Sequence, residues 1–400
     1  MPTKVTVEQN KLVYADGKPF FLIGARHMPE GGTPAILAEA GFNAYRTLAF
    51  GTESADPDPF PDATDGIYFW SYVFDRTFLG RSPQYRFQLE KLVKRVRSHP
   101  AFLCYENFNE PAKVSMWKED KKAPKALPED LSAGTALLRN LDSQHPIWLA
   151  HNFQRTVETL ASYNTCADIV GSNCYPVMPV GGIRRYLTVR NDGRMIDCPD
   201  QSIHAVAHYT EKMMKVVDRR MPVWMLIQGM ANANWLDPAN TPIAAERTID
   251  ASKIRYPTHK ELRFMAFDAI TAGATGLAMS LHKTPVGSDA WKAVTHVARE
   301  LRELCEALTS PAYAGRLAVT YTDIGFTIWD GVKLLARQDR HSLWLFAVNT
   351  AFDPAKISIH IPDTSCHRAT VAGENREVKF DNSTIHDFFE PYGVHVYRMH

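Results

Sequence analysis

Two glutamates lie four residues apart in the segment Tyr105–Pro111, and Glu110 stands inside an Asn-Glu-Pro tripeptide. The apolar run before them is of strand type, so both side chains share one face of a strand. Glu110 then falls at the strand end, and Glu106 points inward about 13 Å deeper. A carboxyl at the end can protonate a leaving oxygen if an apolar setting raises its pKa, whereas a buried one needs a cation or hydrogen bonds. We expect Arg46 to pair with Glu106 or with a substrate group.

The elements that position these groups alternate between short apolar runs and amphipathic helical stretches. A sheet of parallel strands covered by helices is the expected result, and eight such units over roughly 290 residues predict an α/β fold of the (β/α)8 TIM barrel type. Reacting groups in such a barrel lie at the C-terminal ends of the strands. The predicted strands are Phe20–Ala25, Phe42–Thr47, Gly66–Val73, Phe102–Phe108, Pro146–Ala150, Asp168–Asn173, Val223–Gln228 and Gly276–Ser280, and the predicted helices are Thr33–Ala40, Gln84–Ser98, Asp130–Leu141, Ile203–Arg219, His259–Ala272 and Trp291–Leu308.

The residue pattern of the sequence changes at Ser310-Pro311, after which β-branched residues and turns predominate. This pattern predicts a small antiparallel β-sandwich. We therefore expect two domains, a catalytic barrel over residues 1–309 and a sandwich over 310–400. The predicted sandwich strands are Ile324–Trp329, Val332–Arg337, Ser342–Val348, Ile357–Ile361, Ala369–Val371 and Gly393–Tyr397.

Composition excludes several classes of partner. Lys plus Arg is 45 against 44 for Asp plus Glu, which gives no electrostatic reason to expect nucleic acid or an anionic membrane. No apolar run reaches about 18 residues, and the first residues lack the apolar core of a secretory signal. We expect a soluble protein, cytoplasmic as written, or secreted or periplasmic if a signal has been removed. Aromatic residues make up 11% of the chain, which suits sugar faces as well as cores.

Polar side chains follow several of the other predicted strands. His27, His151 with Asn152, and His282 fall at the ends of the first, fifth and eighth strands, where they can hydrogen-bond hydroxyl groups. Neither an HxH nor an HExxH spacing is present, and the six cysteines show no metal-ligand spacing. We therefore expect neither a metal nor a cofactor.

The segment Tyr105–Pro111 resembles the fourth-strand motif of glycoside hydrolase clan A, particularly the cellulase-like family 5 type. The resemblance extends over nearly the whole chain and implies a TIM-barrel glycosidase with a C-terminal β-sandwich that acts on a carbohydrate. Further stretches that carry it are Asp16–Phe21, Gly41–Arg46, Asn173–Pro176, Tyr256–Arg263, Gly273–Gly276 and Phe388–Tyr397.

The resemblance implies a role for each matching position. Glu110 would be the general acid/base, Asn109 would hold the sugar 2-hydroxyl, and Tyr175 would hydrogen-bond the nucleophile. Arg46 would support the catalytic carboxylates, and Asn173 belongs to the matching sixth-strand stretch that would face the sugar. The sequence departs from the family at the nucleophile, where it has Gln228 instead of glutamate.

That departure matters because an amide neither attacks the anomeric carbon well nor stabilises positive charge. Three explanations compete: an engineered Glu→Gln change, a natural glutamine branch with another base, and a barrel that binds glycans without catalysis. We rank the natural branch first. It requires another carboxylate at the site, for which Asp75 is the first candidate, followed by Asp237 and Glu53. An inverting enzyme separates its carboxyl groups by about 6.5–9.5 Å.

The sugar-stacking position also departs from the family, because Ser280-Leu281-His282 stands where relatives usually have a tryptophan. Trp235 or Trp70 would then supply the stacking face. Arg184 and Arg185 could clamp the carboxylate of an acidic sugar. The sequence thus predicts hydrolysis of a glycosidic bond, with a glycan-binding or transglycosylating relative as the alternative and a barrel lyase or isomerase on sugar acids as the third.

Overall fold

The computed structural model describes residues 3–8, 11–48, 66–113, 123–178, 187–189, 195–197, 202–236, 254–324, 331–362 and 364–400. For residues 187–189, 195–197, 235–236 and 323–324 it describes the backbone alone. Four predicted site residues lie outside the described residues: the candidate carboxylates Glu53 and Asp237, and the candidate clamp Arg184 and Arg185.

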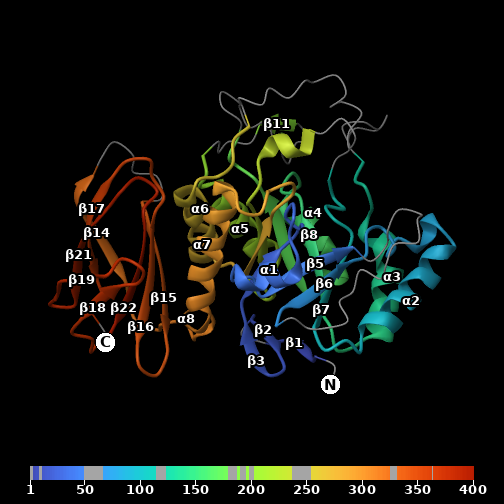
Figure 1. Ribbon diagram of the computed structural model, residues 1–400, viewed down its shortest axis with the longest axis horizontal. Coiled ribbons are helices and arrows are strands. Elements are labelled where there is room, and N and C mark those ends of the chain that lie inside the picture. Colours follow the sequence, from blue (N-terminus) through green and yellow to red (C-terminus); the bar gives the residue numbers. More distant parts are fainter. Residues whose placement is uncertain are drawn as a thin grey trace.

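Eight parallel strands close into a barrel at the centre of the molecule (Figure 1). Around the barrel the order is β12-β13-β4-β5-β6-β7-β8-β9, so neighbours in sequence are mostly neighbours in space. The TIM-barrel prediction is confirmed, and each of the eight predicted runs supplies one strand. The strands are β4 (Leu22–Ala25), β5 (Ala44–Leu48), β6 (Tyr68–Tyr72), β7 (Phe102–Glu106), β8 (Ile147–His151), β9 (Ile169–Cys174), β12 (Trp224–Gln228) and β13 (Gly276–Ser280).

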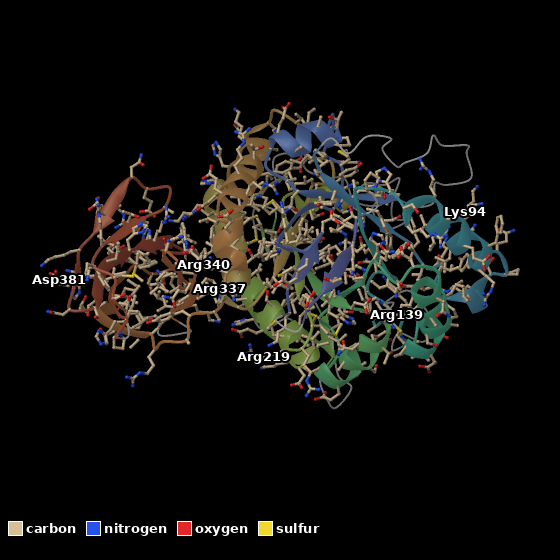
Figure 2. The ribbon with its side chains drawn as sticks, turned by 90° about the horizontal axis from the view of Figure 1, so that it is seen from below. Lys94, Arg139, Arg219, Arg337, Arg340 and Asp381 are labelled. Carbon is tan, nitrogen blue, oxygen red and sulfur yellow. The ribbon has the colours of Figure 1, made fainter. Side chains whose placement is uncertain are left out.

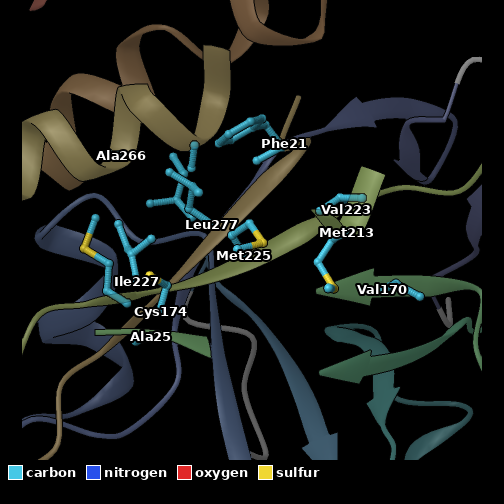
Figure 3. Packing of buried hydrophobic residues seen from close by; sticks show 14 of the residues in the cluster. Phe21, Ala25, Val170, Cys174, Met213, Val223, Met225, Ile227, Ala266 and Leu277 are labelled. Carbon is cyan, nitrogen blue, oxygen red and sulfur yellow. The ribbon is translucent and has the colours of Figure 1, made fainter. Parts of the chain in front are cut away.

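Helices surround the barrel and cover the outward faces of its strands. Figure 3 shows Met225 and Leu277, on β12 and β13, beneath the helix that carries Ala266. Helix α6 begins at a capping box in which Thr258 and Glu261 bond each other's backbone N–H groups. The helices are α1 (Pro34–Glu39), α2 (Gln84–Val96), α3 (Pro128–Leu141), α4 (Val157–Ala161), α5 (Ala205–Val216), α6 (His259–Thr271), α7 (Asp289–Glu303) and α8 (Cys305–Thr309), with the 3-10 turns η1 (Leu79–Arg81), η2 (Ser162–Cys166) and η3 (Asn232–Leu236).

Three tryptophans pack together inside the barrel. Trp70, Trp148 and Trp224 are fully buried, and their ring centroids lie 5.6 and 5.5 Å apart in successive pairs. Glycines on other strands make room for them: a Cβ on Gly24 of β4 would lie 2.9 Å from the Trp70 ring, and one on Gly276 of β13 would lie 2.5 Å from Trp224. The barrel interior is therefore packed with side chains at the level of these tryptophans.

A three-stranded antiparallel sheet at the N-terminus packs against the same interior cluster. It consists of β1 (Val5–Val7), β2 (Val13–Ala15) and β3 (Lys18–Phe20), of which only the end of β3 lies in a predicted strand. The small pair β10 (Leu187–Val189) and β11 (Met195–Asp197) was not predicted either. No helix among the described residues is long and apolar enough to cross a membrane.

The C-terminal region forms two antiparallel sheets that enclose a core of their own, as predicted. They lie beside α6, α7 and α8 (Figure 1), where Phe267 of α6 stacks on Phe346 of the sandwich and Arg263 donates to the Val394 carbonyl oxygen at 2.7 Å. Arg337 lies at this junction and Asp381 at the outer edge (Figure 2). One sheet contains β14 (Ala318–Ile324), β17 (Ala355–His360), β21 (Thr384–Phe389) and β20 (Phe380–Asp381), and the other contains β15 (Val332–Gln338), β16 (Leu343–Asn349), β22 (Val394–Met399), β18 (Ala369–Val371) and β19 (Arg376–Val378).

The first sandwich strand differs from its prediction. The strand ends at Ile324, where the prediction had it begin, and it pairs with β17 through a bulge between Tyr321 and Asp323. Residues 325–329 of the predicted strand lie outside the described residues. Strands β19, β20 and β21 were missed, because their short or polar segments lack the apolar runs on which the prediction relied.

Candidate active site

The inner carboxylate, Glu106 at the end of β7, is fully buried among donors. Its Oε2 accepts a 2.9 Å hydrogen bond from the Trp70 indole. Its Oε1 lies 3.4 Å from Nη2 of Arg26 and 3.6 Å from Nη1 of Arg46. The ion pair that burial requires is therefore present, and it includes the Arg46 partner that the sequence suggested.

Arg26, which follows β4, joins this buried carboxylate to the groups above it. Its guanidinium donates to Asn109 Oδ1 at 2.8 Å, to the Tyr175 hydroxyl at 3.1 Å and to Asn173 Oδ1. Burial by itself lowers the pKa of Arg26, but Tyr175 and the two glutamates reverse this and raise it. Arg26 thus remains a cation at the centre of the barrel mouth, by which we mean the C-terminal ends of the eight strands.

Glu110 lies at the mouth with its backbone in the left-handed region, at φ 54°. Its N–H donates to the Ala150 carbonyl oxygen at 2.8 Å, which ties the turn to β8. A non-glycine residue held at positive φ costs free energy, and such strain concentrates at functional sites. The turn directs the carboxylate toward two amides, Asn173 at 2.9 Å and Asn152 at 3.4 Å.

Two lysines also approach the Glu110 carboxylate. Nζ of Lys113 lies 2.9 Å from Oε2 and Nζ of Lys125 lies 3.8 Å from it. Burial raises the pKa of Glu110, but the two lysines and Asn173 outweigh it and lower the pKa to about 2. In this state the carboxyl is an anion, which differs from the raised pKa that a general acid requires.

Gln228 ends β12 on the same strand face as Trp224 and Leu226, which point into the barrel. Its Oε1 accepts from the Val177 N–H at 2.8 Å, and its Nε2 donates to the carbonyl oxygens of Val177 and Met230 at 2.9 and 3.0 Å. A carboxylate could accept the first bond but donate neither of the others. The amide is therefore suited to this position in a way that glutamate is not.

Tyr175 was expected to contact the residue at the nucleophile position. Instead its hydroxyl donates to Asn173 Oδ1 at 3.1 Å and accepts from Arg26. The amide of Gln228 bonds backbone groups of the segment that follows Tyr175. Tyr175 thus belongs to the network around Arg26.

The three histidines at strand ends have different surroundings. The Nδ1 atom of His27 lies 3.0 Å from Ser280 Oγ, and its ring meets His282 edge to face, so both belong to the mouth. Burial, followed by Arg46 and Arg26, lowers the pKa of His27 well below its usual range. His151 is a correction: it is fully buried on the outward face of β8 against Tyr163, and burial lowers its pKa to about 3. It does not reach the mouth.

Two further expectations also require correction. Trp70 is fully buried and bonded to Glu106, so it offers no face to a sugar. Asp75 is bound by Arg76, Arg81 and Tyr85 at 3.0–3.2 Å, and those bonds outweigh burial and lower its pKa. This arrangement anchors the segment after β6 and does not direct Asp75 to Glu110. The side chain of Trp235 lies outside the described residues.

Sequence reasoning missed Arg26, Lys113 and Lys125. Alternation along β4 gives a signal for Arg26, because Leu22 and Gly24 face the interior and the next residue on that face is Arg26. The lysines had no comparable signal, since both come from segments without periodic structure. Within the described ranges, no group of three or more His, Cys, Asp or Glu side chains is arranged to hold a metal ion.

No known family profile matches the chain, and no curated protein matches its sequence. Its fold is similar to several solved structures. The β-galactosidase from Bacillus circulans sp. alkalophilus has a TM-score of 0.57 at 9% identity, over 95% of this chain and 99% of that one. The glycoside hydrolase family 30 subfamily 8 xylanase Xyn30A from Clostridium acetobutylicum has a TM-score of 0.52 at 13% identity, over 94% and 95%.

A GH30 endoxylanase from Clostridium papyrosolvens C71 has a TM-score of 0.50 at 10% identity, over the whole of both chains. At such identities the likeness concerns the fold alone. The chain therefore shares the architecture of these glycoside hydrolases, a closed parallel barrel followed by antiparallel sheets.

Proposed function

We propose that the protein is a glycoside hydrolase of clan A type that cleaves a glycosidic bond at the barrel mouth, with Glu110 as its general acid/base. The observation that carries the proposal is the strained, buried position of Glu110 at the C-terminal end of β7, where its carboxylate meets Asn152 and Asn173. Catalytic groups of TIM barrels lie at this end of the strands. The amide and guanidinium groups around Glu110 are the kinds of donor that bind sugar hydroxyls.

Glu110 must first bind a proton in order to act as an acid. Lys113 and Lys125 oppose this, but their side chains are 40% and 34% exposed, against 9% for Glu110. A sugar that enters the mouth can displace them into solvent and leave the carboxyl in a buried environment, which raises its pKa. The lysine contacts therefore belong to a resting state, and Glu110 takes up its proton when substrate binds.

Hydrolysis then proceeds with Glu110 as both donor and acceptor. Its carboxyl proton passes to the glycosidic oxygen as the bond between that oxygen and the anomeric carbon breaks. Water adds its oxygen to the anomeric carbon and gives a proton to the Glu110 carboxylate. Gln228 takes no covalent part, because its amide is bound to backbone groups. With Asp75 held elsewhere, the candidates for the second carboxylate are Glu53 and Asp237, which lie outside the described residues.

A second candidate function is carbohydrate binding without turnover. The observation that favours it is that Gln228 is held as a structural amide, so that no carboxylate occupies the usual nucleophile position. This explanation shares the substrate and the mouth with the first. It differs only in whether the glycosidic bond breaks.

The deciding experiment compares wild type, Glu110→Gln and the control Glu90→Gln on a panel of aryl glycosides, with sugar binding measured by calorimetry. Glu90 is 44% exposed on α2 and pairs with Arg86, so its change leaves the mouth intact. We expect Glu110→Gln to lower kcat by about 100-fold or more while it still binds sugar. Full activity in Glu110→Gln would remove the acid role, and a wild type that binds sugars but cleaves none would establish the second candidate.

A further inference from the structure

The guanidinium of Arg46 is nearly buried yet poorly paired. Its side chain is 8% exposed and its face lies 5.2 Å from the centre of the Tyr72 ring. The nearest carboxylate oxygen, on Glu106, is 3.6 Å away, which is longer than a hydrogen bond. Among the residues that the structure describes, none accepts a hydrogen bond from Arg46. The five donors of this planar fork thus have few acceptors within the part of the chain that the structure describes.

Glu106 is already committed to other donors. Trp70 occupies Oε2 at 2.9 Å, and Arg26 bonds Oε1 at 3.4 Å while it also binds Asn109 and Tyr175. Arg46 is therefore the second cation on a carboxylate that already has one. Burial lowers the pKa of Arg46 more than the attraction of Glu106 raises it, which is the effect of a cation that lacks a full counter-charge.

The charges of the described mouth residues do not balance. The two buried cations, Arg26 and Arg46, share the one buried carboxylate of Glu106, whereas Glu110 is paired with the partly exposed Lys113 and Lys125. Gln228 brings no charge to the end of β12. A buried site with an excess of positive charge favours a ligand that brings negative charge with it.

We propose that the mouth is selective for a sugar that carries a carboxylate, a uronic acid residue, and that Arg46 binds this carboxylate through its planar fork. The inference rests on the proposed function for the identity of the ligand as a sugar. A carboxylate fits because two parallel N–H donors of a guanidinium match its two oxygens. The acidic sugar supplies the second counter-charge that Arg46, which shares Glu106 with Arg26, does not find among the described residues.

The test is calorimetric binding of glucuronate and galacturonate to the full chain, each compared with its neutral partner, glucose or galactose. We expect each acid to bind about tenfold or more tightly than its partner, because a hydrogen bond to a charged group is worth at least that factor. Arg46→Gln should bring the ratio close to one, and Arg46→Lys should keep part of it. Arg86→Gln, on an exposed ion pair of α2, is the control that should leave the ratio unchanged.

Equal binding of acid and neutral sugars by wild type overturns the inference, and so does a ratio that neither Arg46 variant changes. If Arg46→Gln fails to fold, the wild-type ratio and Arg46→Lys decide. Cleavage assays separate this inference from the proposed function. Hydrolysis of glycosides without preference for glucuronides over glucosides leaves the function standing and refutes the inference, whereas tight binding of uronic acids without cleavage does the reverse.

Discussion

The ends of β7 and β12 present two polar side chains at the same mouth, and they are held in different ways. Glu110, beyond β7, is bound by side chains, two of which belong to lysines that are 34–40% exposed. Gln228, at the end of β12, is bound by backbone groups of Val177 and Met230 and is fully buried. The two lysines can move into solvent without disturbing the fold, whereas the backbone partners of Gln228 cannot.

This difference suggests a chemical role for Glu110 and a structural role for Gln228. A group that must exchange a proton needs partners that can leave, because each protonation state requires different hydrogen bonds. A group whose acceptor and donor atoms are both matched by a fixed backbone has one state only. The β7 end is therefore suited to catalysis, whereas the β12 end joins the segment after β9 to the barrel.

The strongest challenge to this comparison is Gln228→Glu. A buried carboxylate would face the carbonyl oxygens of Val177 and Met230 with no proton to donate, so we expect a loss of about 3–5 kcal/mol in the free energy of unfolding and no gain of hydrolysis. Denaturant unfolding and an aryl glycoside assay measure the two effects.

Gln88→Glu is the matched control, because the same chemical change then faces the Nε of Arg76, 3.2 Å from the amide oxygen, on a part-exposed surface. It should change stability by less than about 1 kcal/mol. A stable Gln228→Glu protein that gains activity would mean that the β12 end is a disabled nucleophile site, as in the engineered or lost-catalysis explanations.

The second prediction uses the side-chain partners of Glu110. Because its pKa in the folded protein is about 2, below the ordinary 4.5, its ionised form stabilises the fold above about pH 5, and this contribution is lost as the pH falls toward 2. Relative to Glu110→Gln, wild type should lose at most about 3 kcal/mol over that window. Urea unfolding at pH 7, 5, 4 and 3 measures the difference. A difference that does not change with pH would contradict the lysine pairing.

The sequence was most informative where strand alternation and burial act together. Apolar runs identified all eight barrel strands, and the need to neutralise a buried charge pointed from Glu106 to Arg46. At β8 the prediction did not follow this alternation. His151 and Asn152 were both assigned to the mouth, although adjacent residues of a strand face opposite sides and only Asn152 reaches Glu110.

Other errors arose where the sequence holds no local signal. Every residue of Tyr68–Tyr72 except Ser71 is aromatic, so polarity could not show that Trp70 faces the core. Val177, which bonds both amide atoms of Gln228, lies 51 residues away along the chain, and the partners of Glu110 include two lysines from irregular segments. Contacts of this kind depend on tertiary structure, which periodicity does not encode.

The smallest and most specific effect is expected from Lys113→Met, which removes one displaceable partner and leaves the backbone contacts of Gln228 intact. The Lys113 ammonium lies 2.9 Å from the Glu110 carboxylate, so its loss should raise the pKa of Glu110 by about one pH unit. If the acid form is the active one, it then persists to higher pH, and the alkaline limb of kcat/KM moves upward by the same amount.

Lys292→Met is the control, because it breaks an ion pair of the same spacing, with Asp289 on exposed α7, and should leave the profile in place. A carbon-13 titration of the Glu110 carboxyl gives the same pKa independently of activity. An unchanged pKa would show that Lys113 does not hold the carboxylate. A raised pKa with a stationary pH profile would show instead that Glu110 is not the proton donor, and the chemistry would then have to lie elsewhere in the mouth.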